Sequence, residues 1–120
     1  MSTIIIQPTD TIDQVLKQFM LIYDGLKFEF FTKTHRHGEG SHANELLPRT
    51  TCINELSKLA GPIEIDVSPD VTVAEMESAF DLHGLNIQVF RKMKSTWLET
   101  VQTDGYSLKQ QMKLSTQSRS

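Results

Sequence analysis

The chain has 120 residues, 38% of them hydrophobic, and its 12 basic and 15 acidic residues give a net charge of -3 with histidine neutral. This size predicts one domain with a modest core, and the acidic balance argues against a polybasic surface for nucleic acid or anionic lipid. We expect no signal peptide, no membrane span and, with Cys52 as the only cysteine, a reducing cytoplasmic setting.

The first 33 residues predict a strand, a helix and a second strand. Ile4 to Ile6 form an apolar strand that ends before Pro8, because proline lacks the N–H that a ladder needs. The capping box Thr11-Ile-Asp-Gln14 predicts a helix from Ile12. Gly25 is expected to end this helix in the left-handed conformation. Within this helix, apolar residues recur at helical spacing at Ile12, Val15, Leu16, Phe19 and Ile22. The strand after Gly25 has Leu26, Phe28 and Phe30 on one side.

The next segment contains a polar loop and two short elements. A weak strand is expected at about Ala43 to Leu47. A short helix is expected from about Cys52 to Ala60, with Ile53, Leu56 and Leu59 inward, before the terminator Gly61-Pro62.

The remainder of the chain predicts the same order of elements. Ile63, Ile65 and Val67 alternate with acidic residues, as in a half-buried strand, and the capping box Thr72-Val-Ala-Glu75 starts a helix at Val73. Gly84 is followed by a strand with Leu85, Ile87 and Val89 on one side. Met93-Lys94 forms a turn into a partner strand, Ser95 to Val101, with Trp97, Glu99 and Val101 on one face. A last helix follows Asp104-Gly105, with Ser107-Leu-Lys-Gln110 as its capping box.

These two halves indicate an internal repeat. Residues 4–21 align with 65–82 at five identities, and 25–33 align with 84–92 at four more, nine in 27 positions. We therefore expect a tandem duplication of a β-α-β-β-α unit, with repeat one at 1–61, repeat two at 62–114 and a polar tail at 115–120. A unit of about 55 residues is marginal alone, so the copies should share one core with pseudo-twofold symmetry. The predicted fold is α+β, a mostly antiparallel sheet with helices packed on one face.

The second half also resembles a known family. Thr72-Val73-Ala74-Glu75, Val89-Phe90-Arg91-Lys92 and Trp97-Leu98-Glu99-Thr100 resemble hallmarks of a small module in uncharacterised bacterial proteins, often from Bacteroidetes. Gly84, Ile87, Thr103-Asp104 and Ser107-Leu108 match its pattern as well. The resemblance covers about half of the chain and implies a repeat unit. It implies no activity, because none is assigned to the module.

Three histidines and the cysteine are the candidates for chemistry. His35 and His37 are two apart, so both imidazoles can face one metal ion, with His42 folding back across the intervening glycines. The alternative is a solvated hairpin loop, since Gly, Ser, His and Asn gather in turns. Cys52 at a helix start can be a nucleophile, or a small buried hydrophobic residue. No established catalytic or ligand motif accompanies them, so the sequence favours a non-enzymatic protein without a cofactor.

The strands carry the candidate binding residues. Alternation places Phe31 and Phe90 on the face away from the helices, where we expect them exposed in an apolar patch with Ile5 and Leu46 or Leu98. Phe31, Phe90, Arg91 and Trp97 are the predicted partner-binding residues. The leading hypothesis is a protein-interaction module that uses a sheet face or edge, with a second copy of the chain as one candidate partner. The alternative functions are binding of single-stranded nucleic acid by the strand aromatics, and metal binding or metal-dependent activity at His35, His37 and His42. The apolar patch itself can also be an ordinary surface, since scattered exposed apolar residues are normal.

Overall fold

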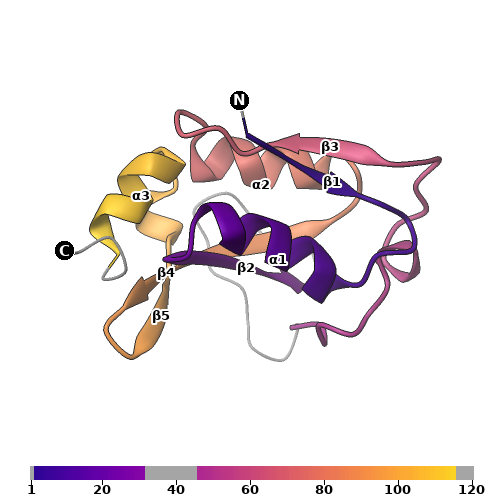
Figure 1. The fold of residues 1–120 in the computed structure, drawn as a ribbon, viewed down its shortest axis with the longest axis horizontal. Helices are drawn as coiled ribbons and strands as arrows, with labels where there is room; N and C mark the ends of the chain where they lie inside the picture. The colour runs from indigo at the N-terminus through magenta and orange to yellow at the C-terminus, as the bar shows by residue number, and fades with distance from the viewer. Residues whose placement is uncertain (1, 32–45, 116–120) are drawn as a thin grey trace.

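The computed structural model describes residues 2–31 and 46–115, which form an α+β fold (Figure 1). Its strands are β1 (Thr3–Ile6), β2 (Leu26–Phe31), β3 (Ile63–Asp66), β4 (Asn86–Met93) and β5 (Thr96–Glu99). Its α-helices are α1 (Ile12–Ile22), α2 (Val73–Asp81) and α3 (Leu108–Leu114), and two short 3-10 helices are η2 (Ile53–Glu55) and η3 (Val101–Thr103). No helix within these two described ranges is long and apolar enough to cross a membrane.

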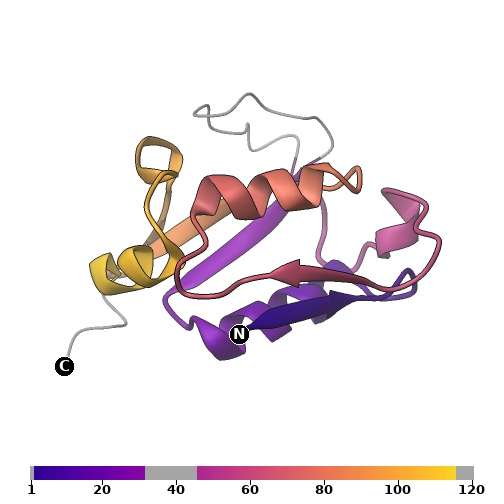
Figure 2. The ribbon, with the colours of Figure 1, turned by 90° about the horizontal axis from the view of Figure 1, so that it is seen from above.

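The strands form two antiparallel sheets. β1 pairs with β3, with Ile4 opposite Ile65, and β4 lies between β2 and β5 in a three-stranded sheet. The predicted α+β class and antiparallel pairing are confirmed, but the strands divide into two sheets instead of one. Each long helix contacts both sheets, because α1 packs on β1 and β2 while α2 packs on β3 and β4. α3 lies beside the β4–β5 hairpin at one end of the molecule (Figures 1 and 2).

An aromatic cluster forms the centre of the core. The Phe28 ring lies 5.2 Å from Phe19, 5.7 Å from Phe30 and 5.3 Å from Phe80, measured between ring centroids. All four rings are fully buried, and Ile4, Ile6 and Ile65 from the two-stranded sheet join the same cluster. Both sheets and both long helices therefore share one hydrophobic core.

Local capping signals correctly predict where the helices begin. The side chains of Thr11, Thr72 and Ser107 accept from the third backbone N–H of α1, α2 and α3, and a Gln or Glu reaches back in each case. Gly84 has the expected positive φ, +76°. Gly25 does not, so that prediction is wrong. Its position instead excludes a side chain, because an added Cβ would overlap Ser115 Oγ and lie 2.9 Å from Met112 Sδ.

The segment after Cys52 departs from the prediction of a helix to Ala60. Only Ile53–Glu55 forms a single 3-10 turn, and the chain then bends. The Ser57 hydroxyl donates to the carbonyl oxygen of His83 at 2.6 Å, which ties this segment to the end of α2. Leu56 and Leu59 still pack on the core, so tertiary contacts replace helical periodicity here.

The predicted strand at Ala43 to Leu47 lies partly outside the described residues. Within the described part, Leu46 forms a β-bridge with Phe31, and the Leu47 N–H donates to the carbonyl oxygen of Phe30. The predicted strand at Ser95 to Val101 is shorter than expected. The chain leaves β4 after Glu99, and Val101 begins η3.

Corresponding connections in the two halves make corresponding hydrogen bonds. Asn54 N–H donates to the carbonyl oxygen of Pro8, and Lys109 N–H donates to that of Pro69. Likewise, the Ile53 N–H donates to the carbonyl oxygen of Asp10, and the Leu108 N–H donates to that of Val71. The Ile12 N–H donates to the carbonyl oxygen of Thr51, and the Val73 N–H donates to that of Tyr106. The tandem duplication itself stays a prediction.

Candidate functional site

The face of the three-stranded sheet opposite the helices carries most of the predicted binding residues; we call it the outer face. Lys27, Glu29 and Phe31 alternate with the core residues of β2 and therefore point to this face. On the neighbouring strands, Phe90 lies opposite Lys27, Trp97 opposite Lys92 and Glu99 opposite Phe90. Paired residues share a face, so Phe31, Phe90 and Trp97 lie together on the outer face.

A buried ion cluster occupies the middle of the outer face. The Glu29 carboxylate is 7% exposed and accepts from Lys27 Nζ at 2.8 Å and Arg49 Nη2 at 2.8 Å. Burial alone would raise the pKa of the Glu29 carboxyl, but the hydrogen bonds from Arg49 and Lys27 outweigh it and lower the pKa below its usual range. Glu29 is therefore charged at neutral pH and holds Lys27 in place.

Lys27 also orders the aromatic side chains of this face. Its Nζ lies 5.3 Å from the Phe90 ring centroid and 5.0 Å from that of Trp97, while Lys92 Nζ lies 5.1 Å from the Trp97 centroid. These distances are typical of cation–π contacts. Two ammonium groups therefore contact the Trp97 indole at the edge of the sheet.

A groove of about 460 Å³ opens beside these rings. Its lining is largely apolar and comprises Lys27, Glu29, Phe31, Leu46, Phe90, Trp97, Leu98 and Glu99. Phe31 forms part of the wall and is only 5% exposed, so the prediction of an exposed ring at this position is wrong. Leu46 and Leu98 belong to the groove, but Ile5 lies in the other sheet and does not.

Arg91 does not lie with Phe90, contrary to the grouping expected from the sequence. Its guanidinium donates to Gln111 Oε1 at 2.8 Å, which directs the side chain to α3. Alternation along β4 already contained this signal, because Arg91 is two residues from the core residue Val89. The sequence also indicated that Lys27 and Glu29 belong to the outer face, because they are charged residues within an otherwise apolar strand. Nothing in the sequence around Arg49 indicated that this residue belongs to the site.

Gln88 is the least exposed polar side chain of the outer face. It lies opposite Glu29, is 1% exposed, and its Nε2 donates to the carbonyl oxygen of Val89 at 3.1 Å. Its Oε1 accepts no hydrogen bond from the described part of the chain. A buried acceptor of this kind is uncommon in folded proteins.

We expect Glu29→Gln to lower the free energy of unfolding by about 1–3 kcal/mol, because it leaves two cations around a neutral amide in a largely buried position. Chemical denaturation at neutral pH measures the loss. Glu64→Gln, on the exposed side of β3, is the matched control and should change stability by less than about 0.5 kcal/mol. Equal effects of the two substitutions would contradict the stabilising role of the ion cluster.

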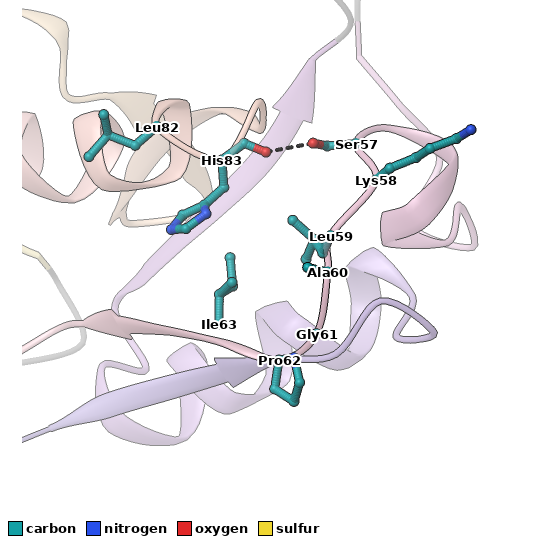
Figure 3. Close-up of a pocket in the computed structure, with 9 residues that line it drawn as sticks. All are labelled: Ser57, Lys58, Leu59, Ala60, Gly61, Pro62, Ile63, Leu82 and His83. Atoms are coloured by element: carbon teal, nitrogen blue, oxygen red, sulfur yellow. Dashed lines mark hydrogen bonds between the residues drawn. The ribbon is translucent and has the colours of Figure 1, made fainter.

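A second hollow, of about 480 Å³, lies between the loop after η2 and the end of α2. Figure 3 shows His83, Leu59 and Ile63 pointing into it, whereas Lys58 points away, and it shows the Ser57 bond to His83. The lining residues of this hollow include no buried charge and no Phe, Tyr or Trp. The outer-face groove is therefore the better candidate for a binding site.

The candidate chemical residues do not form a site in the described structure. His35, His37 and His42 lie outside the described residues, and the part of the chain that is described contains no group of three or more His, Cys, Asp or Glu suited to a metal. Cys52 is half-buried, and its backbone N–H donates to Glu55 Oε2 at 2.9 Å.

Comparisons with known proteins give no family for this chain. No family model, curated protein or solved structure matches it.

Proposed function

We propose that this chain is a protein-interaction module that binds a partner polypeptide in the outer-face groove and along the adjacent strand β5. The observation that carries the proposal is the groove itself, in which Phe31, Phe90 and Trp97 are set beside an edge strand. Large aromatic side chains are enriched where proteins bind one another. An edge strand adds backbone hydrogen bonds, while a neighbouring pocket selects side chains.

The direction of the backbone groups supports binding along β5. The Thr100 N–H donates to the carbonyl oxygen of Val89 at 3.2 Å, so Thr100, Leu98 and Thr96 turn their backbone groups toward β4. Trp97 and Glu99 alternate with them and direct theirs toward the outer edge. No strand in the described part of the chain pairs with that edge.

Binding of single-stranded nucleic acid is the second candidate, favoured by the lysines and aromatic rings on one face. Two observations weigh against it. Lys27 and Lys92 lie against the indole where a base would stack, and the charge of Lys27 is balanced by Glu29. Arg91, which would flank such a site, is directed to α3.

The proposal is tested by selecting peptides from a random library on the wild-type protein and titrating them while recording Trp97 fluorescence. Trp97 is the only tryptophan of the chain and lines the groove, so its emission reports binding there. We expect apolar peptides that shift the emission, and loss of their binding in Leu98→Lys. Peptides that bind Leu98→Lys equally well would contradict the proposed surface. Salt-sensitive binding of a single-stranded oligonucleotide with the same emission change would favour the second candidate.

A further inference from the structure

The edge strand β5 is flanked by hollows on both of its faces. The outer-face groove contains Leu98 and Glu99, and a hollow of about 440 Å³ containing the same two residues also borders Arg91, Val101 and Thr103. Leu98 is 44% exposed between them. An apolar side chain at an edge, with space on either side, is a feature that isolated edge strands normally avoid.

The charges around β5 are arranged from one end of the strand to the other. Lys94 lies in the hairpin turn before β5, and Lys92 lies opposite Trp97 in the half of the strand nearer that turn, whereas Glu99 is the last residue of the strand. Two copies of this edge placed antiparallel bring the basic end of each beside the acidic end of the other. A parallel arrangement would place like charges together, which is unfavourable.

We infer that the partner of β5 is a second copy of this chain, joined antiparallel across the two β5 edges on a twofold axis at Leu98. This inference rests on the proposed binding surface and names its occupant. In this register Trp97 of each copy lies opposite Glu99 of the other, and these are the residues whose backbone groups point outward. The two Leu98 side chains meet on the helix side of the sheet. The two three-stranded sheets become one sheet of six strands.

The short length of β5 sets the strength of this dimer. Four residues of strand and one leucine pair bury little surface, and contacts below about 1,200 Å² in total are typical of transient complexes. The dimer should therefore form reversibly and depend on protein concentration. Replacement of Leu98 by lysine places two like charges at the axis, and lysine on an edge strand is a natural block to such pairing.

Sedimentation velocity over protein concentrations from about 1 to 500 μM, with Trp97 emission recorded on the same samples, tests this inference. We expect the wild-type protein to pass from monomer to dimer together with a change in emission. Leu98→Lys should weaken association at least about tenfold, a change of 1.4 kcal/mol. Leu82→Lys is the matched control, since Leu82 is 85% exposed at the end of α2, and it should dimerise as the wild type does.

Three outcomes would overturn the inference: a wild-type protein that is monomeric throughout, a dimer unaffected by Leu98→Lys, or a dimer lost in Leu82→Lys. Unfolding curves of both variants check that they are folded, which we expect because both side chains are exposed. A monomer that still binds selected peptides in the groove would contradict the second copy but leave the proposed function intact. A monomer that binds none would contradict both.

Discussion

Phe28→Ala should lower the free energy of unfolding by about 3–5 kcal/mol, because it removes a fully buried ring at the centre of the core. Phe28 contacts Phe19, Phe30 and Phe80, so the cavity is bordered by three other rings that cannot all move to fill it. A domain of this size is usually stable by only about 5–15 kcal/mol. The variant should therefore be close to unfolding, which urea titration followed by circular dichroism can measure.

Phe90→Ala is the control for this substitution. Phe90 lies on the adjacent strand but on the outer face, half-buried, and its ring contacts Lys27. Loss of this contact should cost about 1 kcal/mol, consistent with a cation–π interaction. If both alanine variants lost the same stability, the outer face would be part of the core and the account of the groove would be wrong.

Glu77→Gln is expected to stabilise the protein above pH 7 by about 3 kcal/mol, because burial raises the pKa of the Glu77 carboxyl to about 7 and Gln carries no charge. The nearby charges of Asp104 and Glu99 raise the pKa further, while a hydrogen bond from the Val89 N–H, at 3.1 Å, opposes the rise. This bond has a structural cause. The chain leaves the sheet at Thr100, and the Glu77 carboxylate accepts from Val89 where a strand carbonyl would otherwise do so.

The sign of the pH dependence follows from proton binding. With a pKa near 7 when folded and 4.5 when unfolded, the folded protein binds more protons between these two values. The contribution of Glu77 is therefore most favourable below pH 4.5 and is lost as the pH rises through 7. The free energies of unfolding of the wild type and Glu77→Gln should be similar at pH 4.5 and diverge toward pH 8. A difference that is constant with pH would contradict the raised pKa.

Local signals explain the parts of the fold that sequence predicts well. A capping box needs only four consecutive residues, so the starts of α1, α2 and α3 at Ile12, Val73 and Leu108 follow from the sequence alone. Period-two alternation likewise identifies the inner and outer sides of β2 and β4. It also places Phe31 and Phe90 on the face away from the helices, whereas the place of Trp97 beside them depends on the register of β4 and β5.

Features set by distant contacts could not be predicted in this way. Gly25 is required by the approach of Ser115, which is 90 residues further along the chain, and not by its own backbone conformation. The segment after Cys52 bends because Ser57 bonds to His83. The division into two sheets depends on how α1 and α2 pack on strands of both. None of these contacts has a signal in the sequence near the residue that it affects.

The candidate site shows the same division. Alternation predicts that Phe31 and Phe90 lie on the outer face, but it does not predict the low exposure of Phe31, because it separates the two faces without saying what covers either. Arg49 reaches Glu29 from a loop 20 residues away, so the buried ion cluster also required the structure.

The amide hydrogen exchange of Trp97 tests the central claim that the outer edge of β5 is a binding surface. In dilute solution the Trp97 amide should exchange much faster than that of Leu98, which faces β4, and it should become protected when a second copy or a selected peptide binds. Slow exchange of the Trp97 amide at every concentration, unchanged by Leu98→Lys, would mean that the chain covers this edge itself and would contradict the account.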